Sequence, residues 1–284
     1  MQLLNRFPLA ALFFLLAARP AIAQPDGADA PPPNIVIIFT DDLGYGDLSC
    51  FGHPTIHTPH LDALAAHGMK LTQCYVASPV CSPSRAALLT GCYPKRVGMH
   101  QHVIFPQFDY GLHTDETTIA DMLSDHGYAT GMFGKWHLGH RPGLMPNDQG
   151  FDTYYGVPYS NDMSAVHRRP GHNYNFRLPL MRDREVLEWE PDQRVFTRNY
   201  TQEAVAFIEE NKDQPFFVYL PHSMPHIPLY ASEDFEGTSP RGLYGDVIEE
   251  IDWSVGQIVA TPPSVMRSIA AGSIPVGAMS MSIA

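Results

Sequence analysis

A cysteine and an arginine four positions apart open the stretch Cys81-Ser-Pro-Ser-Arg85-Ala-Ala-Leu-Leu-Thr-Gly91, whose residue types could bind and attack a small anion. Pro83 suits the first position of a helix and Gly91 suits its end, so the pattern predicts a helix. Residues four apart lie on one helix face, and the free N–H groups of a helix N-terminus attract anions. Cys81 and Arg85 would therefore converge on a small oxyanion such as sulfate or phosphate.

Two adjacent carboxylates, Asp41 and Asp42, follow directly after the apolar, β-branched run of residues 34–40. Such a run is typical of a strand buried on both faces, and α/β sheets bind ligands beyond the carboxyl ends of their strands. Adjacent carboxylates stay ionised at low cost when a cation lies between them, and their oxygens suit Ca²⁺ or Mg²⁺. The alternative interpretation is a solvated turn, which Asp residues near a glycine often form.

A lysine and a histidine, Lys135 and His137, follow a predicted strand over residues 128–133. If this segment is extended, both side chains point to one face, where an ammonium and an imidazole could hold an oxyanion and move a proton. The alternative is a surface lysine beside a structural histidine.

A second histidine, His226, lies between Pro225 and Pro228 after a predicted strand over residues 215–220. The prolines restrict the backbone around it, which suits a hydrogen bond to a substrate or a leaving group. Reactive side chains thus follow three predicted strands. We expect them to meet Cys81 in one site.

The cysteine itself has other interpretations, namely one half of a disulfide or a buried thiol. The four cysteines of the chain permit two disulfides, and their pairing stays open. A cysteine-based phosphatase also joins a thiolate to an arginine, but its loop has a longer spacing than the three residues found here. The spacing therefore argues against that class.

Predicted strands alternate with predicted helices along the chain. A further strand is expected near residues 71–76, and helices over residues 58–68, 81–91, 115–126, 200–211 and 244–259. This alternation predicts an α/β fold with a mostly parallel central sheet flanked by helices. Residues 145–198 are rich in Pro, Tyr, Asn and Arg with weak periodicity, and we expect loops or small excursions over the active face.

The two ends differ from this pattern. Residues 1–23 resemble a cleavable secretory signal, because Arg6 precedes an apolar run and Ala-Ile-Ala fits the cleavage site. Residues 24–33 form a predicted linker rich in Pro, Ala and Asp. We therefore expect a secreted or periplasmic protein that has no membrane span after cleavage. Residues 260–284 contain one charged residue, Arg267, and are expected to be a divergent tail.

The charge balance limits the partners of the chain. With 18 basic residues against 30 acidic ones, the formal net charge is −12. Such a chain repels nucleic acid in general, and the sequence has no basic stripe typical of nucleic-acid binding. An anionic substrate must therefore be attracted by a local cationic pocket.

The motifs together resemble those of the formylglycine-dependent sulfatases, which belong to the alkaline phosphatase-like superfamily. Residues 81–85 match the family's Cys/Ser-X-Pro-Ser-Arg signature, residues 134–139 its second signature, and residues 41–47 its metal loop. Residues 156–162 and 242–256 are similar to the arylsulfatase-like branch. The likeness extends from about residue 34 to residue 259, which we expect to form an N-terminal catalytic domain.

The resemblance implies a sulfuric ester hydrolase that acts on a small-molecule or glycan sulfate ester. A formylglycine-generating enzyme would oxidise Cys81 to Cα-formylglycine, whose hydrate supplies the nucleophilic oxygen. Asp41, Asp42 and the modified Cys81 would hold Ca²⁺, with Mg²⁺ as an alternative. Arg85 would anchor the hydrate.

The resemblance also implies roles around the sulfate. Lys135 and Ser160 would bind the sulfate oxygens. His137 would take a proton from the hydrate when sulfate is expelled, and His226 would contact the bridging oxygen of the leaving alcohol.

The sequence departs from the family in length. Family members are longer, and add an Asp-Asn pair to the metal shell and a second lysine to the sulfate site. Residues 260–284 contain no Asp, Asn or Lys. We therefore expect an incomplete, truncated chain that is weakly active or inactive by itself. Two alternatives stay open: a phosphate or phosphonate ester hydrolase of the same superfamily, and a non-catalytic sulfatase fragment.

Overall fold

The computed structural model describes residues 32–167, 171, 174–261, 268–274 and 279–283. The described residues from Pro33 onward belong to one compact unit. The predicted secretory signal, residues 1–23, lies outside the described residues, as does the predicted linker up to residue 31. In the part of the chain that is described, no helix combines the length and the apolar character that a membrane span needs.

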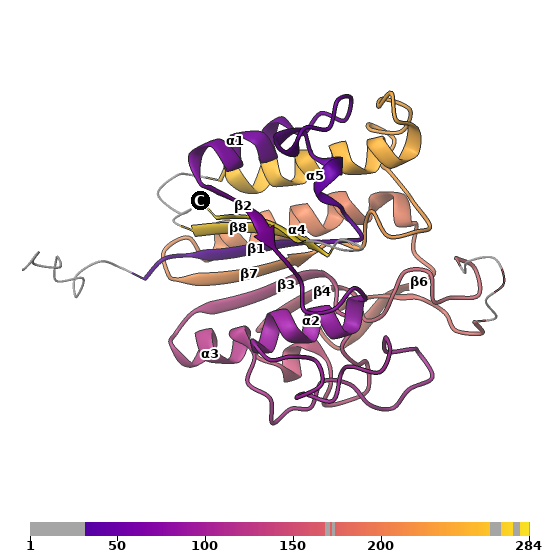
Figure 1. Ribbon diagram of the computed structural model, residues 1–284. Coiled ribbons are helices and arrows are strands. Elements are labelled where there is room, and N and C mark those ends of the chain that lie inside the picture. Colours follow the sequence, from indigo (N-terminus) through magenta and orange to yellow (C-terminus); the bar gives the residue numbers. More distant parts are fainter. Residues whose placement is uncertain (1–31, 168–170, 172–173, 262–267, 275–278, 284) are drawn as a thin grey trace, which may run out of the picture. The chain divides into compact units, whose positions relative to one another are not determined.

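A mixed β-sheet forms the centre of this unit. Its described strands are β1 (Ile35–Asp41), β2 (Met69–Cys74), β3 (Ala129–Lys135), β4 (Thr153–Val157), β5 (Pro179–Arg182), β6 (Glu185–Trp189), β7 (Phe216–Pro221), β8 (Ser268–Ile274) and β9 (Met279–Ile283). They are ordered β2-β9-β8-β1-β7-β3-β4-β5-β6 (Figure 1). The strands from β8 to β4 run parallel, and antiparallel strands extend both edges. The predicted α/β fold with a mostly parallel central sheet is confirmed.

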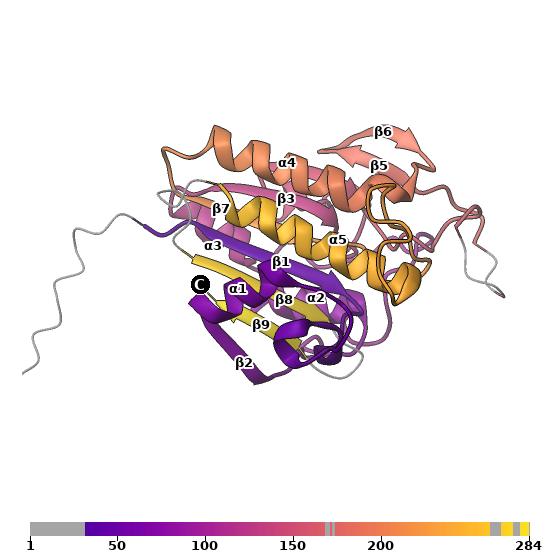
Figure 2. The same cartoon turned by 90° about the horizontal axis from the view of Figure 1, so that it is seen from above.

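Helices cover both faces of the sheet. On one face lie α1 (Pro59–His67), α4 (Phe196–Glu210) and α5 (Gly242–Val259), and on the other lie α2 (Cys81–Thr90) and α3 (Ile119–Asp125) (Figures 1 and 2). The long helix α5 contacts both α1 and α4. The sheet is therefore a middle layer between two helical layers.

The central strand β1 explains why the apolar runs of the sequence are continuous. Val36 and Ile38 pack into the core beneath α1, α4 and α5, whereas Ile37 and Phe39 pack into the core beneath α2 and α3. Each of the four side chains is buried. Because successive residues of a strand point to opposite faces, a strand between two helical layers needs apolar residues at every position.

Three strands lie in residues 145–198, where the sequence predicts loops, so that prediction is wrong. Strand β4 pairs in parallel with β3, and β5 and β6 continue the sheet as an antiparallel pair. Every residue of β6 is exposed. A strand with no buried face shows no alternation of apolar and polar residues, and for this reason the sequence did not predict β6.

Helix boundaries also differ from the predictions. Helix α2 begins at Cys81, as predicted, but Pro83 is the third residue of the helix, within its first turn, and not the first residue. The N–H groups of that turn have no partner inside the helix, so a proline is tolerated there. Helix α3 begins later than predicted, because Thr118 caps it by accepting a hydrogen bond from the Asp121 N–H at 3.1 Å.

The predicted divergent tail contributes β8 and β9 to the same sheet. Strand β8 pairs in parallel with β1 along its whole length, and β9 pairs with β8 and β2. The segment is rich in Ala, Ser and Gly, which have low strand propensity, so the sequence predicted no strand there.

Candidate active site

A buried carboxylate lies at the carboxyl end of β1 between two cations. The Lys135 Nζ donates a hydrogen bond to the Asp41 Oδ2 at 2.5 Å, and an Arg85 N–H donates to the same oxygen at 3.1 Å. All three side chains are at most 1% exposed. Burial raises the pKa of Asp41, but the charges of Lys135 and Arg85 outweigh it and hold that pKa well below its usual range. Asp41 is therefore ionised.

The same cations join the ends of neighbouring elements. Arg85, on α2, also donates to the backbone carbonyl of Lys135 at 2.5 Å. Lys135, at the end of β3, also donates to the Ser160 Oγ at 2.9 Å, in the loop after β4. Because an ammonium has three N–H donors, one remains for a ligand. The contacts hold the ends of β1, β3 and β4 against α2.

The second carboxylate, Asp42, lies at the turn after β1. Its φ of +68° is left-handed, a conformation that asparagine and aspartate adopt more readily than most residues. The Asp41 N–H donates to the Met224 carbonyl at 3.2 Å, which ties this turn to the loop after β7. That loop brings the His226 Nε2 to within 3.9 Å of the Asp42 Oδ2.

Cys81 is the first residue of α2 and is 8% exposed. All four cysteines, each within the described residues, are free, so the structure does not support the disulfide alternative. Burial is the main cause that raises the pKa of the Cys81 thiol, even though Lys135 acts against it. The unmodified side chain is therefore a protonated thiol and a poor nucleophile.

His137 is fully buried and its φ is +62°, so the segment is not extended at His137, and the condition under which both side chains would point to one face is not met. Its Nε2 lies 2.9 Å from the Ile104 carbonyl, an acceptor, so Nε2 carries the hydrogen. The Nδ1 is buried and has no hydrogen-bond partner. Burial, followed by the charge of Lys135, lowers the pKa of His137 well below 6.5. The histidine is neutral, with its lone pair on Nδ1.

A cavity of about 520 Å³ opens beside these groups, and we call it the site cavity. Four of the predicted residues line it, namely Asp42, Cys81, Ser160 and His226, whereas Asp41, Arg85, Lys135 and His137 are buried away from its surface. The remaining lining residues are Pro79, Val80, Val103, Phe105, Asp162, Met163 and Tyr174. The structure therefore brings the predicted residues together, some at the surface of the cavity and some behind it.

Asp162 is a lining residue that the sequence did not single out. It follows Ser160 by two positions in the loop after β4 and is 4% exposed. The spacing of two is the same signal that drew attention to Lys135 and His137, and it could have identified Asp162 as well.

The oxygen donors present fit part of the shell of a hard divalent cation. The Asp41 Oδ1 is buried and has no hydrogen-bond partner, while Oδ2 of the same carboxylate is bonded to the two cations. Asp42 adds a second carboxylate next to it. In the described part of the chain, no group of three or more His, Cys, Asp or Glu side chains is placed to hold a metal ion. Ca²⁺ takes 6–8 oxygens, so these carboxylates fit part of its shell.

Comparison with known proteins places the chain in a family. Residues 33–261 match the family described as sulfatase. The chain is 39% identical to human arylsulfatase A over 87% of its length and 50% of that protein. It is 40% identical to the pig N-acetylgalactosamine-6-sulfatase over 80% of its length and 46% of that protein. The chain thus spans about half the length of the curated relatives it matches.

The fold agrees with solved structures. The crystal structure of Ps i-CgsB superposes with a TM-score of 0.77 at 30% identity, covering 88% of this chain and 65% of that one. A phosphonate monoester hydrolase of Agrobacterium radiobacter superposes with a TM-score of 0.61 at 17% identity, covering 89% and 68%, which shows a shared fold alone. The resemblance of the motifs is confirmed by a match that covers both signatures and the metal loop: the chain belongs to the sulfatase family.

Proposed function

We propose that the protein hydrolyses sulfate esters of small molecules or glycans through a formylglycine made from Cys81. One observation supports this most directly: Cys81 lines the site cavity at the N-terminus of α2, above the buried cluster of Asp41, Arg85 and Lys135. The N-terminal N–H groups of α2 and the remaining donor of Lys135 suit a sulfate group.

The chemistry explains why the thiol would need to be modified. As a protonated, buried thiol, Cys81 is a poor nucleophile, and a sulfur–sulfur adduct with sulfate would be slow to break. A hydrated aldehyde has two hydroxyl groups on one carbon. One oxygen can bond to sulfur, and the other can later expel the sulfate without an attack of water on sulfur.

The residues of the site have distinct roles in this proposal. An oxygen of the hydrate attacks the sulfur and releases its proton to solvent, and the bond from sulfur to the alcohol oxygen breaks. His226 donates a proton to that alcohol oxygen and regains one from solvent. The Nδ1 of His137 then takes the proton of the second hydroxyl, the carbonyl re-forms and sulfate leaves. Addition of water to the aldehyde restores the hydrate. Lys135 and Ser160 bind the sulfate oxygens, and Arg85 anchors the hydrate.

A divalent cation, Ca²⁺ or Mg²⁺, belongs to the proposal as well. When bound, it supplies positive charge against the sulfate oxygens. Asp41 through its Oδ1, Asp42 and the modified Cys81 would hold it.

Maturation and location are the remaining parts of the proposal. A formylglycine-generating enzyme would modify Cys81, and residues 1–23 would direct secretion or export to the periplasm. The acidic chain, with a net charge of −12, is not expected to bind nucleic acid.

The test combines mass spectrometry with kinetics on the full chain coexpressed with a formylglycine-generating enzyme. We expect the peptide that contains Cys81 to lose about 18 Da, the difference between H₂S lost and O gained. Turnover of an aryl sulfate should exceed that of the matching aryl phosphate and should disappear in Cys81→Ala. Cys92→Ala is the matched control, because Cys92 is also free but does not line the site cavity. An unmodified thiol together with undiminished turnover in Cys81→Ala would contradict the proposal.

A further inference from the structure

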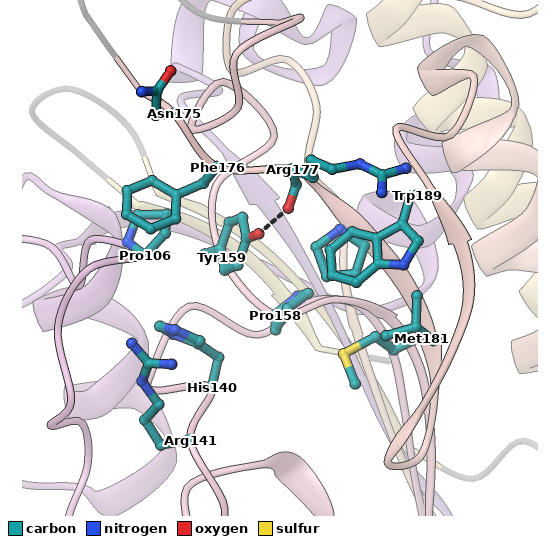
Figure 3. A pocket seen from close by; sticks show the side chains of 12 residues that line it. Pro106, His140, Arg141, Pro158, Tyr159, Asn175, Phe176, Arg177, Met181 and Trp189 are labelled. Carbon is teal, nitrogen blue, oxygen red and sulfur yellow. Dashed lines mark hydrogen bonds between the residues drawn. The ribbon is translucent and has the colours of Figure 1, made fainter.

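A second cavity, of about 450 Å³, is lined by residues that Figure 3 shows. Three segments contribute consecutive residues to the two cavities: Phe105 and Pro106, Ser160 and Tyr159, and Tyr174 and Asn175, with the first of each pair in the site cavity. The two cavities therefore adjoin along these three segments. A molecule bound in one cavity lies close to the other.

The second cavity is cationic in an acidic protein. Arg141 and Arg177 both line it and both are exposed. Among the described residues that line it there is no carboxylate, and the ion pairs found in the described part of the chain include neither arginine. The chain as a whole carries a net charge of −12. This is therefore a local positive site for an anion.

Contacts within the protein hold both arginines in place. The guanidinium carbon of Arg177 lies 4.9 Å from the ring centroid of Trp189, a cation–π contact. The backbone carbonyl of Arg177 accepts the hydroxyl hydrogen of Tyr159. Among the described residues, Arg141 bonds through its Nε, which donates to the Phe108 carbonyl at 3.3 Å, and no bond of its terminal N–H groups is found there. A guanidinium can hold a sulfate or a carboxylate with two parallel hydrogen bonds.

Aromatic rings line the space between the two arginines. Figure 3 shows Tyr159 between the side of the cavity that carries Arg141 and the side that carries Arg177 and Trp189. Trp189 is 45% exposed, although large aromatic side chains are usually buried. Aromatic faces pack against the apolar C–H face of a sugar ring, and a few polar groups around such a surface provide orientation.

We propose that the second cavity binds a second anionic group, together with its sugar ring, of a substrate whose first sulfate lies in the site cavity. The inference rests on the proposed function and narrows it to saccharides that carry at least two anionic groups. Arg141 and Arg177 bind the second sulfate or carboxylate, and the exposed Trp189 contacts the ring. A monosulfated substrate leaves the two arginines without a ligand and binds less tightly.

The test compares a disaccharide with two sulfate groups, the same disaccharide with one, and an aryl monosulfate. For the chain without substitutions, carrying formylglycine at position 81, KM should be about tenfold lower for the disulfated than for the monosulfated disaccharide. Arg177→Gln and Arg141→Gln should each remove most of this preference through KM, and leave kcat and aryl sulfate turnover within about twofold. A tenfold change corresponds to about 1.4 kcal/mol. Arg184→Gln is the matched control, because Arg184 is exposed, pairs with Asp148 and does not line the cavity.

If the chain without substitutions and both variants show the same ratio of KM values for the two disaccharides, the inference is overturned and the proposed function stays intact. If the chain without substitutions hydrolyses none of the three substrates, the proposed function fails. Calorimetric titration of the disulfated disaccharide then tests the inference separately. Binding of the disulfated disaccharide that weakens about tenfold in Arg177→Gln but not in Arg184→Gln supports the second cavity. Binding that is the same in both variants overturns it. Melting temperatures verify that each variant is folded.

Discussion

Removing the ammonium of Lys135 should destabilise the fold, because this ammonium compensates the charge of the fully buried carboxylate of Asp41. Asp41 has its Oδ2 bonded to Lys135 and Arg85, and its Oδ1 has no hydrogen-bond partner. We expect Lys135→Met to lower the free energy of unfolding by about 3 kcal/mol, since breaking a buried ion pair leaves a charge without compensation. Urea denaturation measures this loss.

A surface lysine provides the matched control for that substitution. Lys212 pairs with Glu209 at 3.8 Å and its side chain is 51% exposed. We expect Lys212→Met to change the free energy of unfolding by less than about 1 kcal/mol. Equal losses in the two variants would mean that Asp41 does not depend on Lys135 for its charge.

His222 makes the stability of the protein depend on pH. It is fully buried, its Nε2 lies 3.2 Å from the Ser254 Oγ, and burial lowers its pKa to about 3. Below a pH of about 6.5 the unfolded chain takes up a proton at this histidine while the folded chain does not. This contribution to stability is therefore present at neutral pH and is lost as the pH falls from about 6.5 towards 3.

Replacing His222 by glutamine should remove that dependence and keep a polar group beside Ser254. Between pH 7 and pH 5 one such proton changes the free energy of unfolding by about 2 kcal/mol, and the difference between the two pH values should shrink by that amount in His222→Gln. Denaturation at both pH values measures it. His113→Gln, at a side chain that is 70% exposed, should leave the difference unchanged. An unaltered difference in His222→Gln would show that His222 is protonated in the folded state.

At the scale of elements, sequence pattern predicted the central strands β1, β3 and β7, and missed β4, although β4 is buried as well. The continuous apolar runs identified β1, β3 and β7, because these strands are buried on both faces. Strand β6 has no buried residue, and five of the seven residues of β8 are Ala, Ser or Gly, so neither run produces a periodic signal. Strand β6 forms by pairing with β5, which directly precedes it, whereas β8 pairs with β1 from the other end of the chain and with β9.

The residues of the candidate site were identifiable because each follows a strand or begins a helix. Asp41, Cys81, Lys135 and His226 occupy such positions, and the structure gathers them at one edge of the sheet. Their distances were not predictable, since they depend on strand order and on left-handed turns such as that of His137. Asp162 was missed because its spacing of two from Ser160 was not weighed, and that spacing alone does not show that the loop faces the site cavity.

The pairing of β3 with β4 requires a residue without a side chain at position 156. A Cβ added to Gly156 would lie 1.8 Å from the Gly134 carbonyl oxygen on the neighbouring strand. A backbone atom cannot move aside as a flexible side chain can. We expect Gly156→Ala to cost at least about 3 kcal/mol of unfolding free energy, at the upper end for overpacked positions.

Kinetics should change together with stability in that variant, because Ser160 follows β4 by three residues and bonds to Lys135. Gly46→Ala is the control: an added Cβ there has no atom within 4 Å, and we expect a change within about 0.5 kcal/mol. Chemical denaturation of both variants measures the contrast. Similar values for the two would indicate that β3 and β4 separate at little cost.

At the scale of the whole molecule, the two faces of the sheet form the core, and the carboxyl ends of its strands position the site. Helices on both faces bury the central strands, which leaves the carboxyl ends of β1, β3, β4 and β7 free to position polar side chains. The net charge of the whole chain and the charge at the two cavities are opposite in sign. The chain is acidic overall, while the buried cations Arg85 and Lys135 and the exposed arginines Arg141 and Arg177 are placed at the two cavities. Anion binding is thus local in a protein that repels anions at long range.

Strand β1 depends on a partner from the far end of the chain. It pairs with β7 on one side and with β8 on the other, from Ile35↔Ser268 to Asp41↔Ile274. A chain that stops after Thr261 would leave the β8 side of this buried, apolar strand as an open edge, which is a template for aggregation. We expect it to form oligomers in light scattering and to lose a cooperative melt, whereas a chain that starts at Pro33 stays monomeric. A monomeric chain that stops after Thr261 with an unchanged melting temperature would show that β8 contributes nothing to the stability of the sheet.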